Sequence, residues 1–392
     1  MHVLGRRQRA VAVAGAAVAL LAACGNNGGS TASGGNGGGD PYKLGVLVSQ
    51  TGPASQLGVG ELRGAQMAAD EINAKGGVDG HKLQIIGVDD QTKPDQDVQQ
   101  ARQLSRQGVA AIVGPSVVAG CHAAEPMVNA RGPVDYCLSP GITPSGYQWS
   151  ATVKTDDLAA ALLKYWKGKG LTKIGLISTT DGSGKDGARA VTDAAKKAGA
   201  TVVASATYDP TAVSATSQLQ QVMAGKPQAL VVWSTGTPAG VALKGIQQLG
   251  IDLPVATTDG NLSNTFLKRI ADYTPSTLLI PATRDFWWQT LKDDDPAKAL
   301  EKQYHEKYQQ KYNEQPDLGP GVGYDAVQLI AQALKKAGST DAAKVKSALE
   351  QVDGFVGVVG TYHMSANDHR GLGEQDVAIV QAKDGAFTYV GR

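Results

Sequence analysis

The chain contains few aromatic residues, few cysteines and no excess of charge of either sign. Phe, Trp and Tyr make up 5% of the 392 residues, there are 3 cysteines, and 37 Lys and Arg residues are balanced by 36 Asp and Glu residues. The longest block of like charge is the short acidic run from Asp293 to Asp295. Nucleic-acid-binding domains carry a basic stripe or patch instead. We therefore expect no nucleic-acid partner.

Long apolar runs are also scarce, and the most prominent one lies at the N-terminus. "AVAVAGAAVALLAA" (residues 10–23) follows Arg6, Arg7 and Arg9. A run of this length is too short for a bilayer span, which takes about 20 residues. It has the size of the hydrophobic region of a secretory signal peptide. We therefore predict that residues 1–23 are a signal peptide and that the protein is exported.

The end of this run, "LAAC" (residues 21–24), resembles a lipobox. The resemblance implies cleavage before Cys24 and a lipid on its sulfur, which would anchor the protein to the extracytoplasmic face of the cell membrane. The alternative is an apolar region that merely ends in cysteine. The lipobox is favoured because "GNNGGSTASGGNGGGDP" follows it, and a Gly/Ser-rich segment is typical of a flexible linker. We predict that residues 24–41 are a tether.

From Tyr42 onward, short apolar runs alternate with helical patterns. Strands that are apolar on both faces and separated by helices indicate a parallel sheet covered on two sides. The alternation occurs in two series of four, which predicts an α/β protein with two doubly wound lobes. A single eight-stranded β/α barrel is the alternative. Further helices at 296–311 and 323–336 and a hairpin at 376–391 favour two lobes, because a barrel would need none of them. The predicted strands are 43–49, 82–88, 109–115, 134–140, 173–179, 201–207, 229–235 and 254–260.

The segments that follow the predicted strands are rich in Ser, Thr, Gly and Asp. In open parallel sheets, ligands bind at the carboxyl ends of the strands. Loops of any α/β protein favour the same residues for their turns, which is the simpler explanation. Because hydroxyls lie beside glycines in both series, we expect a binding site that both lobes contribute to. Examples are "SQTGPASQLG" (49–58), "SPGITPSG" (139–146) and "TTDGN" (257–261).

Motifs of catalysis and cofactor binding are missing or incomplete. The chain has no G-x-S-x-G elbow, and "DGSGKDG" (181–187) lacks the first glycine and the Ser/Thr of a P-loop. "GVGELRG" (58–64), which we expect to open a helix, has Arg63 where a dinucleotide fingerprint needs its third glycine. No Cys/His pair has zinc spacing. We therefore expect neither an enzyme nor a metal or cofactor site.

Two cysteines, Cys121 and Cys137, flank a stretch that also contains His122. A metal site, a Cys/His nucleophile and a disulfide are the alternatives. Cys121 is expected near the start of the helix after the third strand, and Cys137 near the end of the fourth. Consecutive β/α units lie side by side, so the two Cα atoms can approach within the roughly 4.4–6.8 Å that a disulfide needs. In an exported protein we expect the two cysteines to pair.

The sequence resembles the leucine/isoleucine/valine-binding proteins, receptors of ABC importers with the type I periplasmic-binding-protein fold. The segments that carry the resemblance are "KLGVLVSQTGPASQLG" (43–58), "GAQMAADEINAKGGVDGHKLQIIGVDDQTKPDQDVQQARQL" (64–104), "VAAIVGP" (109–115), "GYDAVQLIAQAL" (323–334) and "DHRGL" (368–372). The resemblance implies two lobes joined by three crossovers, with a ligand cleft between them. It places lobe 1 at 42–153 and 282–358, and lobe 2 at 154–281 and 359–392.

The resemblance also implies roles for individual residues. Thr143 would hold the ligand carboxylate together with backbone at Gly141, and Asp259 would receive the ligand ammonium. Asp259 could instead cap the following helix. We also expect Ser116 to bind the ligand. The expected disulfide would stiffen the loops that contain these ligand-binding residues, Ser116 on one side and Gly141 and Thr143 on the other.

Other positions depart from the family's pattern. The family serine after the third strand is replaced around Val118, its second-lobe tyrosines by Ser183 and Thr235, and its first-loop aromatic by Leu57. Together with the glycines of "LGPGVG" (318–323), these changes predict a widened pocket.

We therefore predict a monomeric, lipid-anchored receptor that presents a small amino-acid-like ligand to the permease and ATPase subunits of an ABC importer. The ligand would be a hydrophobic, branched-chain amino acid. Aromatic carboxylates, amides and other small organic solutes are the alternative ligands. A sensory module of the same fold and an envelope enzyme are the alternative functions, but no output domain and no catalytic motif support them.

Overall fold

A computed structural model describes residues 39–392 of the chain. The predicted signal peptide (1–23), the predicted lipidation site Cys24 and nearly all of the predicted tether (24–41) lie outside the described residues. Among the helices of residues 39–392, none combines the length and the hydropathy that a membrane span requires.

The first lobe is built on a five-stranded sheet in the order β2-β1-β3-β4-β5. All neighbouring strands are parallel. The side chains of β1 alternate between the two faces: Leu47 packs in one apolar cluster with Leu104, while Val46 and Val48 belong to a second cluster. Both faces are therefore buried, as the continuous apolar runs predict. The strands are β1 (Tyr42–Val48), β2 (Leu83–Asp89), β3 (Ala111–Val113), β4 (Val134–Cys137) and β5 (Gln148–Ser150).

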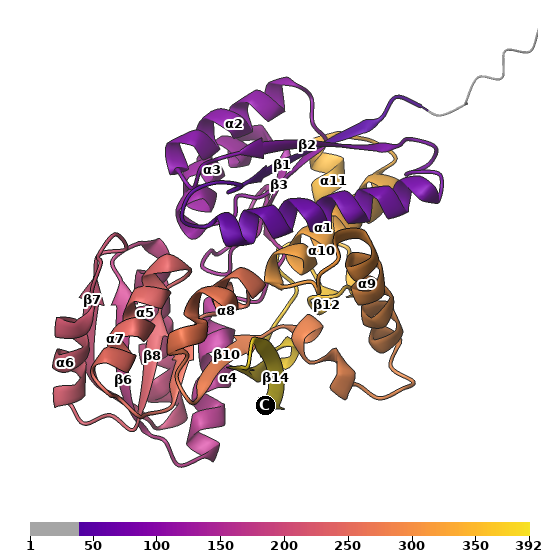
Figure 1. Cartoon of the computed structure of the whole chain (residues 1–392). Helices are drawn as coiled ribbons and strands as arrows, with labels where there is room; N and C mark the ends of the chain where they lie inside the picture. Colours follow the sequence, from indigo (N-terminus) through magenta and orange to yellow (C-terminus); the bar gives the residue numbers. More distant parts are fainter. Residues whose placement is uncertain (1–38) are drawn as a thin grey trace, which may run out of the picture. The chain divides into compact units, whose positions relative to one another are not determined.

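Helices cover both faces of this sheet. The pair α2 and α3 packs on one face, and α1 packs along α10 on the other (Figure 1). The C-terminal part of the chain thus completes a lobe that the N-terminal part begins. The helices of this lobe are α1 (Ser55–Ala74), α2 (Pro94–Arg106), α3 (Val118–Arg131), α10 (Leu318–Ala337) and α11 (Ala342–Leu349).

Glycines allow α1 and α10 to pack in close contact. A Cβ atom on Gly64 would lie 1.9 Å from the Pro320 carbonyl oxygen, and one on Gly323 would lie 2.1 Å from the Glu61 carbonyl oxygen. Since α1 already begins at Ser55, the "GVGELRG" segment lies inside the helix and does not open it. Gly319 and Gly323 pack against the backbone of α1, and Gly321 packs against Asp285 and Val358, so these glycines serve packing contacts and do not widen the pocket as expected.

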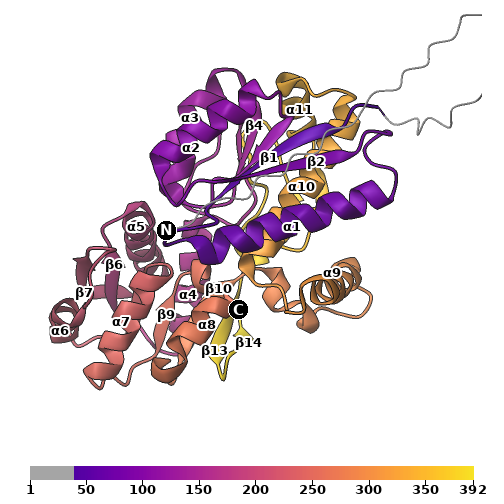
Figure 2. The same ribbon diagram turned by 45° about the horizontal axis from the view of Figure 1, so that its top comes forward.

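The second lobe is built on a seven-stranded sheet in the order β14-β13-β10-β9-β8-β6-β7. Strands β6 to β10 run parallel, whereas β13 pairs antiparallel with β10 and with β14. The last two strands form the predicted hairpin with Asp384 and Gly385 at its turn, beside β10 (Figure 2). The strands are β6 (Lys173–Thr179), β7 (Thr201–Tyr208), β8 (Ala229–Trp233), β9 (Val255–Thr257), β10 (Leu278–Ala282), β13 (Ala378–Lys383) and β14 (Ala386–Gly391).

Several helices of the second lobe are followed by a glycine with positive φ. The helix α5 ends at Gly199, whose φ of 73° is the left-handed conformation that glycine adopts without strain. Gly170 and Gly250, which follow α4 and α7, also have positive φ. The helices are α4 (Thr155–Gly168), α5 (Gly182–Ala198), α6 (Thr216–Ala224), α7 (Thr237–Gln248) and α8 (Asn264–Ile270), with the 3-10 helices η1 (Asp259–Asn261) and η2 (Ala271–Tyr273) around α8.

The chain passes between the two sheets three times. The first passage joins β5 to α4, the second joins β10 to α10, and the third joins β12 to β13. The predicted α/β fold of two doubly wound lobes with three crossovers is confirmed, and the alternative of a single closed barrel is wrong because the sheets are separate and open. The remaining elements are η3 (Arg284–Phe286), η4 (Trp288–Thr290), α9 (Pro296–Tyr312), the paired strands β11 (Asp353–Val356) and β12 (Thr361–His363), and η5 (Glu374–Asp376).

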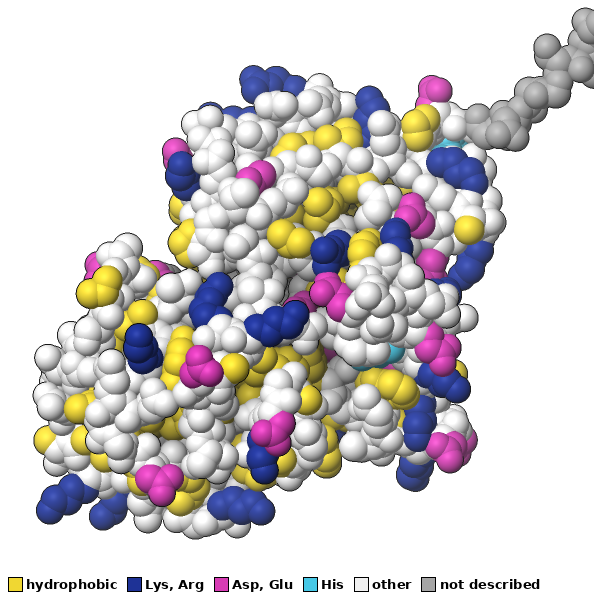
Figure 3. All heavy atoms as spheres, in the orientation of Figure 1, with side chains coloured by type: hydrophobic (Ala, Val, Ile, Leu, Met, Phe, Trp, Pro, Cys, Tyr) yellow, Lys and Arg dark blue, Asp and Glu magenta, His cyan; other side chains and the backbone are white. Residues whose placement is uncertain are grey.

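Charges of both signs are interspersed on the face shown in Figure 3. Several of them form ion pairs at the surface, such as Lys311 with Asp70 at 2.5 Å. This distribution agrees with the balanced charge of the sequence.

Candidate functional site

The candidate site lies where the strands of the two sheets end. The strands β1, β3 and β4 lead into loops with Ser49, Ser116 and Gly141, and the strands β6, β8 and β9 lead into segments with Ser183, Thr235 and Asp259. Each loop follows a strand with buried apolar residues, so the register of the sheet determines which polar residues reach this edge.

The ends of the two sheets are joined by a hydrogen bond from Gln56. Its Nε2 atom donates to the carbonyl oxygen of Gly260 at 3.1 Å, which links α1 of the first lobe to η1 of the second. Leu57, the next residue, is buried. Thr235 packs closely against the same glycine, because a Cβ atom on Gly260 would lie 2.8 Å from the Thr235 side chain. Leu57, Thr235 and Asp259 therefore all lie next to the hydrogen bond between Gln56 and Gly260.

A second contact between the lobes involves Val118 and Gly141. A Cβ atom on Gly141 would lie 2.7 Å from Val118 Cγ2 and 2.9 Å from Asp186 Oδ2 of α5. A Cβ atom on Gly182, the residue before Ser183, would lie 3.6 Å from Val118 Cγ1. The lack of a side chain at Gly141 thus leaves room for both lobes to meet here.

A polar pocket of about 370 Å³ lies beside this contact. Gly141 and Thr143 line it from the first lobe, and Asp186 and Arg189 line it from α5. Thr143 is exposed, so its hydroxyl can reach a ligand. Asp259 does not line this pocket, so the structure places the predicted carboxylate-binding and ammonium-binding residues in different parts of the same junction. The other lining residues are Pro140, Ile142, Pro144, Lys154, Asp156, Asn367, Asp368, His369, Arg370 and Leu372.

Asp259 is 2% exposed and lies in the first turn of η1, directly after β9. Its Oδ1 accepts a hydrogen bond from the Thr258 hydroxyl at 2.7 Å. Burial raises the pKa of this carboxyl to about 6, although the hydrogen bonds from Thr258 and from backbone N–H groups lower it. Within residues 39–392, no lysine, arginine or histidine forms an ion pair with it, although the charge of Arg370 also lowers its pKa slightly from a distance. Asp259 does not cap the next α-helix, because Ser263 caps α8 by accepting from the Phe266 N–H.

Ser116 is buried and is bonded within the first lobe. Its Oγ accepts a hydrogen bond from the Ser49 N–H at 3.0 Å, and its hydroxyl donates to Oε2 of Glu61 on α1. The Ser49 hydroxyl in turn donates to Asp90 at 2.6 Å. The structure therefore connects the predicted site residue Ser116 to two buried acids, neither of which the sequence analysis identified as part of the site.

Arg370 is a further residue that the sequence analysis missed. It lies in the third crossover, is 4% exposed, and donates to the carbonyl oxygens of Pro140 at 3.1 Å and Ile142 at 2.7 Å. It also donates to the Ser150 hydroxyl at 2.8 Å. Burial lowers the pKa of its guanidinium to about 10, so it remains charged at neutral pH. Arg370 positions the loop with Gly141 and Thr143; its only signal in the sequence was its place in "DHRGL".

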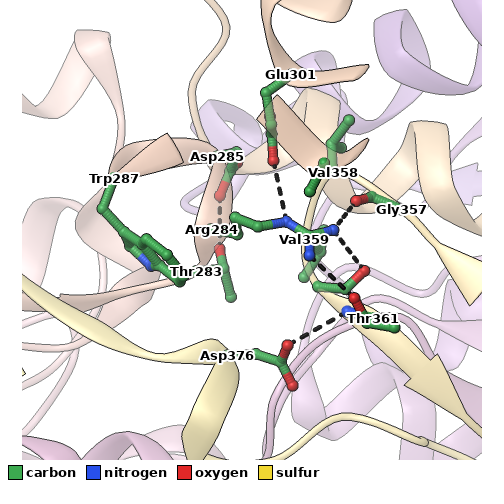
Figure 4. Close-up of polar contacts among 12 residues, drawn as sticks. Thr283, Arg284, Asp285, Trp287, Glu301, Gly357, Val358, Val359, Thr361 and Asp376 are labelled. Carbon is green, nitrogen blue, oxygen red and sulfur yellow. Dashed lines mark hydrogen bonds and ion pairs between the residues drawn. The ribbon is translucent and has the colours of Figure 1, made fainter. Parts of the chain in front are cut away.

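Arg284 connects the second crossover to the turn between β11 and β12 (Figure 4). Its guanidinium donates to the Gly357 carbonyl, to the Gly360 carbonyl at 2.8 Å and to the Thr361 hydroxyl at 3.0 Å. It also pairs with the fully buried Glu301 at 3.4 Å. Arg284 thus ties the second crossover to the turn between β11 and β12.

The predicted disulfide between Cys121 and Cys137 is confirmed, with Cα atoms 5.8 Å apart. It joins α3 to the end of β4, and Ile142 packs against it. The metal-site and nucleophile alternatives are wrong, since both sulfurs are used in the bond.

Replacing both cysteines by alanine is expected to lower the free energy of unfolding by roughly 3 kcal/mol, because the bond closes a loop of 16 residues in the unfolded chain. Urea denaturation of the variant and the oxidised parent measures this difference. Mass spectrometry of an unreduced digest should find the two cysteines in one linked peptide pair. Two free thiols would contradict the pairing.

The chain matches the family model of the periplasmic binding proteins over residues 41–386. It is 33% identical over 109 residues to the Leu/Ile/Val-binding protein of Escherichia coli K12, an alignment that covers 27% of this chain and 30% of that protein. The first relatives are thus matched over less than a third of their length. A Leu/Ile/Val-binding protein homolog of Brucella abortus is 25% identical over 332 residues, covering 81% of this chain and 84% of that protein.

Solved structures share the fold over nearly the whole described chain. A type 1 periplasmic binding protein of Bordetella pertussis has a TM-score of 0.80 at 25% identity, with 90% of this chain and 100% of that chain covered. The branched-chain amino acid transporter substrate-binding protein LivJ of Streptococcus pneumoniae, solved with isoleucine, has a TM-score of 0.75 at 23% identity, with 90% and 100% covered. The predicted resemblance is confirmed: the chain belongs to the periplasmic binding protein family, among the relatives of the Leu/Ile/Val-binding proteins.

Proposed function

We propose that the protein is the extracytoplasmic receptor of an ABC importer and binds a small, hydrophobic amino acid between its lobes. The observation that carries the proposal is the buried Asp259, whose carboxylate forms no ion pair within residues 39–392 and feels only the more distant charge of Arg370. An unpaired buried charge is costly, and a ligand ammonium would compensate it. The Leu/Ile/Val-binding relatives and the isoleucine complex of the S. pneumoniae protein support this ligand class.

The remaining predicted site residues would contribute once the lobes close, because Thr143 and Asp259 lie in different parts of the junction. Thr143 offers a hydroxyl and Gly141 an open backbone for the ligand carboxylate, while Leu57, Val118, Ser183 and Thr235 would surround the apolar part. Ser183 and Thr235 are both partly exposed and small. A larger ligand, such as an aromatic carboxylate or an amide, is therefore the second candidate.

Ligand binding would draw the lobes together about the three crossovers, and the closed form would then dock on the permease, whose ATPase subunits drive import. The lobe bounds are proposed as 42–153 with 282–358, and 154–281 with 359–392. The receptor would act as a monomer on the outer face of the membrane, anchored through lipidated Cys24 and the tether. It would bind and release its ligand unchanged, with no enzymatic step.

A thermal-shift series tests the ligand class. The purified protein is heated with L-leucine, L-isoleucine, L-valine, aromatic carboxylates, amides and polyols. A ligand present at 100 times its Kd should add about 2.7 kcal/mol to the free energy of unfolding, which raises Tm by several degrees. We expect the branched-chain amino acids to give this shift. A shift by ligands that lack an ammonium, with none from the amino acids, would contradict the proposal.

A further inference from the structure

Glu61 lies on α1 with its side chain turned into the first lobe, where it is 2% exposed. Its carboxyl contacts the hydroxyl of Ser116, and that hydroxyl also accepts from the Ser49 N–H at 3.0 Å. One buried acid thus reaches the end of β3, next to the strand ends where the ligand is proposed to bind.

The protonation state of Glu61 determines whether the Ser116 hydroxyl can donate a hydrogen bond to a ligand. A hydroxyl has one proton to donate and can accept two hydrogen bonds. When Glu61 is ionised, it can only accept, so the Ser116 proton is directed at it and is lost to any ligand. When Glu61 is neutral, its own O–H can donate to Ser116, whose two acceptor positions are then filled by Glu61 and Ser49. The Ser116 proton becomes free to be donated elsewhere.

We infer that Glu61 is a positioning residue that makes Ser116 a donor to the anionic group of the ligand, so that ligand binding takes up a proton wherever Glu61 is ionised in the ligand-free protein. The proton comes from solvent and ends on the Glu61 carboxyl; no covalent bond to the ligand forms or breaks. The inference rests on the proposed function, because it requires a ligand with a carboxylate near Ser116.

The groups that surround Glu61 favour its neutral form. Asp90, from the segment after β2, and Asp317, at the start of α10, are the charged groups that act on it from neighbouring elements, and both are acids. Arg63, on the same helix, pairs instead with Glu314. Burial is the largest cause that raises the pKa of Glu61, to about 8, while the Ser116 hydrogen bond opposes it. Glu61 would therefore change its protonation between about pH 7 and about pH 9.

The affinity for L-leucine, measured by calorimetry from about pH 7 to about pH 9, tests the inference. If only the neutral form of Glu61 binds well, the Kd of the wild type should rise about tenfold more over this range than that of Glu61→Gln, whose amide stays neutral. The ammonium of leucine titrates equally with both proteins, so the ratio of the two changes in Kd reports only the effect of Glu61. Near pH 8.5, the enthalpy in buffers of different ionisation heat should show uptake of most of one proton by the wild type and of much less by Glu61→Gln.

Two further variants separate this role from a structural one. Asp135→Asn removes another fully buried acid of the first lobe, bonded to Gln148 rather than Ser116, and should leave the pH profile unchanged. When Ser116→Ala is already present, adding Glu61→Gln should not change the pH dependence of the leucine Kd any further, because Glu61 acts through the Ser116 hydroxyl. Carbon-13 NMR of the ligand-free protein reports directly on the Glu61–Ser116 contact: the Glu61 carboxyl, assigned by its absence in Glu61→Gln, should titrate at a higher pH in Ser116→Ala.

The outcomes are distinguishable. Leucine binding with parallel pH profiles in the wild type and Glu61→Gln would overturn the inference and leave the proposed function standing. No binding of leucine, isoleucine or valine at any pH would overturn the proposed function, and the coupling to ligand would fall with it. A Glu61 midpoint that Ser116→Ala leaves unmoved would overturn the inference without reference to any ligand.

Discussion

Replacing Asp259 by asparagine is expected to weaken the binding of branched-chain amino acids by about two to three orders of magnitude. Removing one partner of a buried charge pair costs about 3–4 kcal/mol of binding energy, since the ligand ammonium would be left unpaired in a desolvated site. Asparagine has nearly the same shape and keeps an acceptor for the Thr258 hydroxyl, so the fold should be preserved. Isothermal titration calorimetry with L-leucine measures the loss.

Stability and pH dependence provide the controls for Asp259. The free energy of unfolding of Asp259→Asn should be equal to or slightly above that of the wild type at neutral pH, because burying the ionised carboxylate is unfavourable and its pKa is raised to about 6. Amino-acid binding to the wild type should weaken as pH falls below about 6, where Asp259 becomes protonated. Asp135→Asn, which alters another buried acid, bonded to Gln148 within the first lobe, should bind nearly as well as the wild type. If Asp259→Asn binds L-leucine as tightly as the wild type, Asp259 does not bind the ligand ammonium and has only a structural role in η1.

Replacing Arg284 by methionine is expected to lower the free energy of unfolding by about 3–5 kcal/mol. The change leaves the buried Glu301 without its arginine partner, with only His305 at 3.9 Å, and removes the donors to the Gly357 and Gly360 carbonyls. Buried acceptors without donors are costly, and methionine fills the volume without offering any N–H group. Urea denaturation of the ligand-free protein measures the difference.

A double-mutant cycle separates the ion pair from the carbonyl contacts of Arg284. Glu301→Leu combined with Arg284→Met should recover part of the loss, because no unpaired charge then remains. Arg284→Lys keeps the charge but lacks the planar fork of donors. Its free energy of unfolding should therefore lie between those of Arg284→Met and the wild type. If the lysine and methionine variants are both as stable as the parent, the network does not hold the second crossover to the turn between β11 and β12.

Several elements of the fold were missed because their local signal is weak. The strand β5 is only Gln148–Ser150, too short for any periodicity to appear, and its pairing with β4 is what defines it. The strand β10 contains Pro281, which argues against a strand inside a sheet. It nevertheless lies between β9 and β13, where the antiparallel partner pairs Pro281 with Ile379. These strands depend on partners that are distant in the sequence.

In the candidate site too, some features have a local signal in the sequence, whereas others depend on residues that are distant in the sequence. Strand ends could be located from apolar runs, and the disulfide from the export signal and the spacing of Cys121 and Cys137. The buried bonds of Ser116 with Glu61 could not be anticipated, because residues 55 positions apart approach only when α1 and the end of β3 are packed together. Arg370 reaches the loop after β4 from 228 positions away, at Ile142. Nothing local distinguishes these two charged residues from exposed ones.

The sequence by itself determined the class of the protein: apolar strands alternating with glycine-ended helices require buried parallel sheets, and the family segments predict two lobes with a site between them. Only the tertiary structure decided which polar groups are buried and how they are paired. It placed Gly319 and Gly323 in a helix contact instead of a wider pocket. It also placed Thr143 and Asp259 in different parts of the junction, and it buried Glu61, Arg284 and Arg370. The physical reason is that secondary structure follows from local periodicity, whereas the protonation and hydrogen bonding of a buried group depend on neighbours that the chain brings together only on folding.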